Sequence, residues 1–261
     1  MNSDSTVSPT GNEIFPGEVF VNTANFDTGI RRLLPKYDEM LDVVAGCIAN
    51  TNHRILELGC GTGELTLKVL KRYPSAEIVA VDYSPRMLDF ARAKIESAGY
   101  AARWTGLEMD FGEWANNPNF SGLGDKFNAC ISSLAIHHLE DEMKLKLFER
   151  IRGSLNAGGC FWNADPLLAE SAGMKDIYQA AREEWARNQG ETLAQIRANV
   201  GTSVSYGYSN PDRLATLSAQ LEMLVKARFD TVAVPWKYYG MAVFGGFVNG
   251  EKQSWRQNFY V

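Results

Sequence analysis

Three glycines at alternate positions follow an apolar run and precede a helical pattern. Gly59, Gly61 and Gly63 come directly after residues 55–58. Glycine lets the main chain turn tightly and approach a ligand where any Cβ would collide. The dinucleotide-binding fingerprint needs its third glycine one position later, where Glu64 stands. The loop is therefore not predicted to bind NAD; it either closes around another small ligand or only makes a tight strand-to-helix turn.

A carboxylate stands at the end of the next predicted strand. Asp82 follows the β-branched run at residues 77–81 and lies 23 residues after Gly59. A carboxylate in this place can accept hydrogen bonds from two ribose hydroxyls. An Asp after a strand is often only a helix cap. Its register with the glycine loop nevertheless favours ribose binding.

Two adjacent histidines follow the predicted strand at residues 127–133. His137 and His138 are two of the three histidines in the chain, and an imidazole can act as a general base at neutral pH. His137 is the preferred candidate. In the alternative interpretation, one histidine caps the following helix and the other packs beneath it. A zinc site is not expected, because the histidines adjoin each other and no cysteine pair has metal-ligand spacing.

Helical and strand patterns place these residues on a common framework. Apolar residues recur at helical intervals over residues 26–50, which predicts a helical cap with Pro35 in the first turn of a helix running to about Asn50. Strands and helices then alternate up to Asp165, which implies parallel strands and right-handed crossovers. Residues 170–200 show helical spacing without strands. The remaining signals are a helix from Asn210 and Pro211, then adjacent strands at residues 229–236 and 239–248.

Composition limits the classes of partner. A chain of 261 residues suits one α/β domain with appended helices. With 26 Lys and Arg against 31 Asp and Glu, the chain has no broad attraction for nucleic acid. Four cysteines without disulfide-like spacing fit a cytoplasmic setting. The first 25 residues do not resemble a signal peptide, and no apolar run reaches membrane-spanning length.

The chain resembles the class I S-adenosylmethionine (SAM)-dependent methyltransferases over roughly residues 26–250. The match rests on Leu-Glu-Leu-Gly-Cys-Gly-Thr-Gly at residues 56–63, Val-Asp-Tyr-Ser-Pro at 81–85 and Ile-His-His-Leu at 136–139. The helical cap, the insertion and the ending at residues 237–244 resemble a narrower group. This group includes small-molecule methyltransferases and, more distantly, the carboxy-S-adenosylmethionine synthases of tRNA wobble modification.

The resemblance implies a Rossmann-like α/β fold with a doubly wound, mostly parallel seven-stranded sheet and a C-terminal antiparallel hairpin. The expected parts are a flexible tail (residues 1–25), a helical cap (26–50), a SAM-binding core (51–165), a helical insertion serving as substrate lid (166–210), and a C-terminal helix and hairpin (211–261).

The resemblance also assigns the cofactor site. Glu57 takes the acidic position before the glycines, and the tyrosine matching Tyr37 touches the cofactor in such relatives. Asp110 is expected to accept from the adenine amino group, with Glu108 as a competitor, while Phe111 covers the ring. The residues expected to bind SAM are Tyr37, Glu57, Gly59, Cys60, Gly61, Gly63, Asp82, Tyr83, Asp110, Phe111, Ser133 and Leu134.

The implied activity is methyl transfer to a small-molecule acceptor by in-line displacement, in a protein that could be a homodimer. Two alternatives stay open: an enzyme that makes carboxy-SAM or modifies tRNA, and a SAM-binding regulatory protein without turnover. The synthases lack the full glycine set, which favours methyl transfer. Arginines at positions 31, 32 and 197 are candidates for binding a carboxylate. The expected aromatic lining of the acceptor pocket is Tyr37, Tyr178, Trp185, Tyr206, Tyr208, Trp236 and Tyr239.

Overall fold

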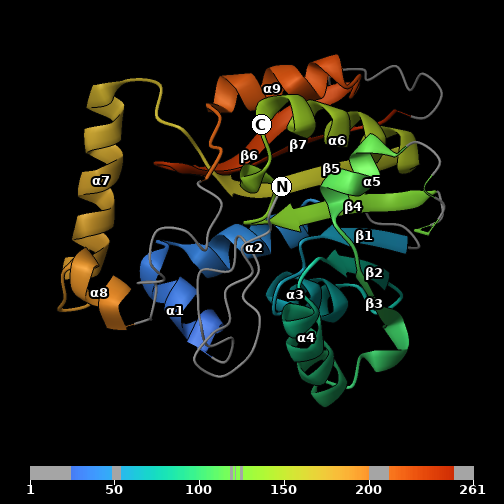
Figure 1. The fold of residues 1–261 in the computed structure, drawn as a ribbon, viewed down its shortest axis with the longest axis horizontal. Helices are drawn as coiled ribbons and strands as arrows, with labels where there is room; N and C mark the ends of the chain where they lie inside the picture. Colours follow the sequence, from blue (N-terminus) through green and yellow to red (C-terminus); the bar gives the residue numbers. More distant parts are fainter. Residues whose placement is uncertain are drawn as a thin grey trace, which may run out of the picture.

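Seven strands form one sheet in the order β3-β2-β1-β4-β5-β7-β6 (Figure 1). This computed structural model describes residues 25–48, 54–117, 120, 122–123, 126–199 and 212–249. The first five strands are parallel, and β7 runs antiparallel to both β5 and β6. The strands are β1 (Arg54–Leu58), β2 (Glu77–Asp82), β3 (Trp104–Glu108), β4 (Phe127–Ser133), β5 (Leu155–Pro166), β6 (Thr231–Tyr238) and β7 (Met241–Phe247).

Helices cover both faces of the sheet. In Figure 1, α3 and α4 lie on one side, and α5, α6 and α9 lie on the other. Short 3-10 turns, η2 (Ala101–Arg103) and η3 (Ile136–His138), precede β3 and α6. The α-helices are α1 (Phe26–Leu33), α2 (Tyr37–Gly46), α3 (Glu64–Arg72), α4 (Pro85–Ser97), α5 (Phe111–Asn116), α6 (Asp141–Ser154), α7 (Ala172–Arg187), α8 (Leu193–Asn199) and α9 (Leu217–Lys226).

The central strands are apolar on both faces because each face has its own core. Successive residues of a strand point to opposite sides of the sheet. Ile55 accordingly packs into the core beneath α2, α3 and α4, while Leu56 packs into the core beneath α5, α6 and α9. Trp162 and Phe161 of β5 divide in the same way. This double burial explains the nearly continuous apolar runs that identified β1 and β4 in the sequence.

The helical cap is two helices, where the sequence predicted one running to about Asn50. The break comes at Leu34, whose backbone is extended (φ −109°, ψ 113°), as expected for a residue that precedes proline. Lys36 then takes a left-handed conformation with φ 62° before α2 begins at Tyr37. Pro35 therefore lies between two helices, outside the first turn of either.

The remaining boundaries differ from prediction mainly at the C-terminal side. The helix expected from Asn210 and Pro211 begins instead at Leu217, because the Thr216 hydroxyl caps it by accepting from the Ala219 N–H. Asn210 and Pro211 lie outside the described residues. The insertion consists of α7 and α8, which stand apart from the sheet in Figure 1 and contact α1. The hairpin of β6 and β7 closes the sheet as expected.

In the part of the chain that the structure describes, no helix is both long enough and apolar enough for a membrane span. All four cysteines, at positions 47, 60, 130 and 160, are free thiols.

Candidate functional site

The glycine loop lies at the carboxyl end of β1, where the strand order reverses between β1 and β4. Such a switch point leaves a crevice at the sheet edge. All three alternating glycines have positive φ, at 67°, 51° and 81°. A Cβ on Gly59 would stand 2.3 Å from the Ala135 Cβ, whereas one on Gly61 would meet nothing within 4 Å. Gly59 therefore lets the loop pass against the segment after β4, and Gly61 faces open space.

Asp82 ties this loop to the neighbouring strand. Its Oδ2 accepts from the Gly61 N–H at 2.8 Å, and its Oδ1 accepts from the Ser84 N–H at 3.0 Å. The residue is 6% exposed. Each carboxylate oxygen can accept two hydrogen bonds, so the carboxylate that shapes the loop can also bind a ligand.

Ten of the twelve residues predicted to bind the cofactor line one crevice around the loop, called here the glycine-loop crevice. The two that do not are Gly63, which is the N-cap residue of α3, and Asp110. The sequence did not single out Phe26, Thr62, Glu64, Leu65, Met87 or Ala135 for this role. The full lining is Phe26, Tyr37, Glu57, Gly59, Cys60, Gly61, Thr62, Glu64, Leu65, Asp82, Tyr83, Met87, Phe111, Ser133, Leu134 and Ala135.

Asp110 is an N-cap residue, which is the other common use of an acid before a helix. Its Oδ1 accepts from the Gly112 N–H at 2.7 Å and from the Glu113 N–H at 3.4 Å. Asp110 and its competitor Glu108 are both exposed and outside the crevice lining. The capping bonds direct the Asp110 carboxylate to its own helix. Of Asp110 and Phe111, only Phe111 therefore lines the crevice.

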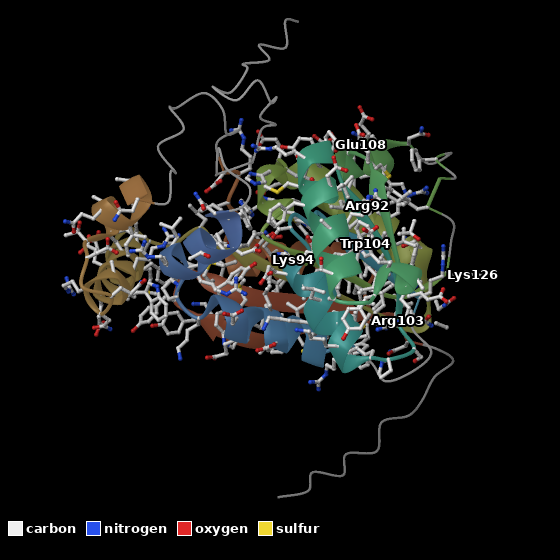
Figure 2. All side chains as sticks on the ribbon, turned by 90° about the horizontal axis from the view of Figure 1, so that it is seen from below. Arg92, Lys94, Arg103, Trp104, Glu108 and Lys126 are labelled. Carbon is white, nitrogen blue, oxygen red and sulfur yellow. The ribbon has the colours of Figure 1, made fainter. Side chains whose placement is uncertain are left out.

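Charged residues hold α1 over the glycine loop. Lys94, labelled in Figure 2, extends from α4 and pairs with Asp27 and, at 2.6 Å, with Glu64. Arg31 pairs with Glu64 and, at 2.9 Å, with Asp38. The free volume of the crevice is about 100 Å³, below the roughly 300–1,000 Å³ of ordinary ligand pockets. A cofactor-sized ligand therefore requires these contacts to shift.

The two cap arginines proposed to bind a carboxylate have acidic partners within the chain. Arg31 pairs with Asp38 and Glu64, and Arg32 pairs with Glu191, which precedes α8. Both guanidinium groups therefore connect the cap to its surroundings.

Glu57 is a fully buried acid beneath the loop. The Thr66 hydroxyl donates to its Oε2 at 2.5 Å. Burial raises the pKa of Glu57 from 4.5 to about 8, and the nearby Asp82 charge raises it further against the effect of the Thr66 bond. The side chain is therefore mainly neutral at pH 7 in the absence of a cationic ligand.

His137 is held by a buried carboxylate that the sequence did not reveal. Its Nδ1 lies 2.8 Å from Oδ1 of Asp165, at the end of β5, and both side chains are buried. Asn163 donates to the other oxygen of Asp165 at 2.8 Å. A protonated Nδ1 that donates to Asp165 leaves a lone pair on Nε2. This arrangement orients Nε2 as a proton acceptor.

The His138 ring packs against that of His137, with 4.0 Å between ring centroids and 43° between the ring planes. Burial and the adjacent His137 lower the pKa of His138 to about 4, so it is neutral at pH 7. Neither histidine caps α6, whose N-cap residue is Glu140. The alternative interpretation, in which one histidine is a helix cap, is therefore wrong.

A second cavity of about 620 Å³, called here the α7 cavity, lies between α7 and the turn that joins β6 to β7. The charged residues of the wall are Arg182, Lys175 and Asp176, and most of the remaining surface is apolar. The lining is Pro35, Pro166, Leu167, Leu168, Ala169, Ser171, Ala172, Lys175, Asp176, Tyr178, Gln179, Ala181, Arg182, Leu214, Tyr238, Tyr239, Gly240 and Met241.

The aromatic residues expected around an acceptor divide between several places. Tyr178 and Tyr239 line the α7 cavity, and Tyr37 lines the glycine-loop crevice. Trp185 instead donates to the Arg32 carbonyl at 3.0 Å, and Trp236 donates to Glu39 at 2.8 Å. These two indoles fasten the cap and line neither cavity. Tyr206 and Tyr208 lie outside the described residues.

Comparison with known proteins agrees with this geometry. Residues 55–159, which include the glycine loop, Asp82 and both histidines, match the methyltransferase domain family. This part of the chain is a methyltransferase domain.

Relatives of this methyltransferase differ in activity. The carboxy-S-adenosyl-L-methionine synthase of Nautilia profundicola is 22% identical over 85% of this chain and 90% of that protein. Malonyl-[acyl-carrier protein] O-methyltransferase 1 of Ilyobacter polytropus is 31% identical over 41% of this chain and 35% of that protein. An O-methyltransferase family protein from Burkholderia thailandensis shares the fold, with a TM-score of 0.62 and 14% identity over 88% of this chain. The methyltransferase spans only 60% of that longer chain.

The raised pKa of Glu57 predicts how the stability of the ligand-free methyltransferase depends on pH. Because its pKa rises from 4.5 to about 8 on folding, its contribution is complete below pH 4.5 and is lost as pH rises through 8. We expect Glu57→Gln to remove a pH-dependent loss on the order of 4 kcal/mol. Thermal unfolding at pH 5, 7 and 9 should show the Tm of the wild type falling relative to the Tm of Glu57→Gln as the pH rises. The exposed Glu96→Gln substitution is the control, and parallel Tm curves for wild type and Glu57→Gln would contradict the assignment.

Proposed function

We propose that this methyltransferase binds SAM in the glycine-loop crevice and transfers its methyl group to a small-molecule acceptor. The observation that carries the proposal is the link between Asp82 and the Gly61 N–H at the switch point of the sheet. This link joins a carboxylate able to bind a ribose to a glycine loop whose backbone a ligand can approach once the cap contacts shift. When bound, SAM supplies an electrophilic methyl group on a sulfonium.

Each wall of the crevice has a proposed task. Asp82 accepts from the ribose hydroxyls through its remaining lone pairs. Phe111 and Leu134 enclose the adenine, and the backbone at Gly59 and Gly61 encloses the amino-acid end. Glu57 lies beneath that end, and a bound cation would favour its ionised form. The crevice would therefore present apolar side chains to the adenine ring and polar groups to the charged amino-acid end of SAM.

The α7 cavity is the proposed acceptor pocket. Its wall includes Leu214, in the short segment that also adjoins the histidines: the Arg213 N–H donates to the His137 carbonyl at 2.8 Å. The Leu168 N–H donates to the Ala215 carbonyl at 2.9 Å, which holds the segment against the cavity. Arg182 and Lys175 suit an acceptor that carries an anionic group.

His137 is the proposed general base. The acceptor atom forms a bond to the methyl carbon as the carbon–sulfur bond breaks, and the electron pair of that bond stays on sulfur. Nε2 of His137 takes the acceptor's proton, and the Asp165 carboxylate stabilises the imidazolium. Alignment of the two reactants can contribute about 7–11 kcal/mol to catalysis, so positioning is the main task of the fold.

A second candidate is the production of carboxy-SAM, favoured by the similarity to the synthase of Nautilia profundicola over most of both chains. The complete set of three glycines is the reason to prefer methyl transfer. A third candidate is SAM binding without turnover.

The proposal is tested by the ligand and the product together. We expect the purified protein to bind SAM in calorimetry and to release S-adenosylhomocysteine with at least one member of a panel of thiols, amines, phenols and carboxylates. Mass spectrometry of the co-purified ligand distinguishes SAM from the heavier carboxy-SAM. Carboxy-SAM would favour the second candidate, and SAM binding without turnover across the panel would favour the third.

Replacing the proposed ribose-binding carboxylate should weaken SAM binding. Asp82→Asn removes the charge from its hydrogen bonds, which is worth about 1.5 to 3 kcal/mol, or roughly a 10- to 150-fold rise in Kd. Isothermal titration with SAM measures the change. Asp89→Asn, at an exposed position on α4, is the matched control and should bind as wild type. An unchanged Kd for Asp82→Asn would remove the ribose assignment.

Loss of the base should reduce turnover and leave SAM binding intact. We expect His137→Ala to lower kcat roughly 100- to 10,000-fold, as is usual for a general base. Asp165→Asn should lower kcat as well, because it disturbs the orientation of His137. Single-turnover kinetics with an acceptor from the panel gives the rate, and SAM calorimetry serves as the folding control. Wild-type kcat in His137→Ala would reduce this histidine to a packing role.

A further inference from the structure

We propose that His137, His138 and Asp212 form a binding site for a divalent transition-metal ion of the zinc class. The proposal departs from the expectation, drawn from the sequence, that the chain has no zinc site. The inference rests on the geometry of the three side chains and does not depend on methyl transfer.

The three ligand atoms already lie close together. Oδ1 of Asp212 is 3.7 Å from Nε2 of His137 and 3.9 Å from Nδ1 of His138. Each of the three residues offers a ligand atom within 4.8 Å of those of the other two. Metal–ligand bonds of about 2.0–2.1 Å at tetrahedral angles place ligand atoms roughly 3.3 Å apart. The Asp212 side chain is 55% exposed and can move closer to both rings, and the two rings adjust their separation as the ion binds.

Adjacent histidines can share one ion here because they present different nitrogens. His137 offers Nε2, since its Nδ1 faces Asp165, whereas His138 offers Nδ1. The tilted rings on the η3 turn bring both nitrogens within 4 Å of Asp212 Oδ1. The sequence argument took the adjacency of the two histidines as evidence against a zinc site, and it had no information on which ring nitrogens face the same side.

Asp165 supplies the support that metal-binding histidines usually have. A ligating imidazole commonly donates its other N–H to a carboxylate, which fixes the ring and strengthens the ligand nitrogen. The 2.8 Å contact between His137 Nδ1 and Asp165 has this form, and Asn163 in turn holds Asp165. His137 is thus oriented as a ligand before any ion arrives.

The Nδ1 atom of His138 is buried and has no hydrogen-bond partner among the described residues. A buried polar atom that lacks a partner is unfavourable. Coordination of an ion would satisfy it. Two cations near Asp212 have other acidic partners: Arg213 pairs with Glu140 at 3.0 Å, and Lys144 pairs with Asp141 at 2.8 Å. Arg182 also lies close enough to interact with the Asp212 charge, and an ion would have to bind Asp212 beside it.

The ligand set selects the class of ion. Two imidazoles and one carboxylate suit Zn²⁺, Co²⁺ or Ni²⁺, whereas Mg²⁺ and Ca²⁺ prefer oxygen ligands alone. Three protein ligands leave a fourth position open, as in catalytic zinc sites. Because a metal and an acceptor proton would use the same Nε2 of His137, bound metal and proton abstraction by His137 exclude each other.

Metal binding to the full-length chain without a histidine tag tests the site directly. After treatment with EDTA and dialysis, titration with ZnCl₂ should give one bound ion per chain, and CoCl₂ should produce the visible absorption bands of four-coordinate Co²⁺. Failure to bind Zn²⁺ in calorimetry would overturn the proposal, whatever the result for SAM.

Variants locate the ion. Asp212→Ala, at an exposed side chain, and His138→Gln should each raise the Kd for Zn²⁺ at least tenfold, and Asp165→Asn should raise it roughly 10- to 100-fold. His53→Gln replaces the one other histidine and should leave the Kd unchanged. SAM binding should persist in Asp212→Ala, which separates this result from the proposed function. Zn²⁺ affinity unaffected by Asp212→Ala and His138→Gln, or abolished by His53→Gln, would refute the site.

Discussion

The structure depends on one carboxylate that connects two neighbouring strand ends. Asp82 accepts from the backbone of the glycine loop and from the start of the next loop, so it fixes the distance between β1 and β2 at the edge where the strand order reverses. The loop can adopt this shape only because its three glycines take positive φ and because Gly59, which has no Cβ, packs closely against Ala135. Asp82 therefore has two roles: it shapes the backbone of the glycine loop, and it is the carboxylate proposed to bind the ribose.

Local patterns carried most of the fold. Two apolar runs, one followed by a glycine and the other by Asp82, predicted β1 and β2. The alternation of strands with helices then predicted the parallel sheet. The cap was harder: its apolar residues keep helical spacing through Leu34 and Pro35, and the restriction that proline places on its predecessor was the available signal for the break. The start of α9 is set by the Thr216 hydroxyl. In the sequence, a single threonine is a weaker signal for the start of a helix than the Asn-Pro pair before it.

The site was less predictable where its parts come from distant segments. His137 stood out by residue type, but Asp165 lies near the end of β5 and Asp212 precedes α9. Nothing in the sequence around either aspartate marks it as a partner of a histidine. The tryptophans show the opposite error. Trp185 and Trp236 suggested a ligand wall, yet an indole N–H needs an acceptor, and the cap supplies one to each. Residue type indicates capability, and only tertiary contacts assign the partner.

The break in the cap places one short bend against two cavities. Pro35 lines the α7 cavity, and Tyr37, only two positions later, lines the glycine-loop crevice. A shift of this bend on filling one cavity changes the wall of the other, and such coupling between binding sites is reciprocal. Under the proposed function, the cavities for the methyl donor and for the acceptor share this bend, so the cap would link the two binding steps.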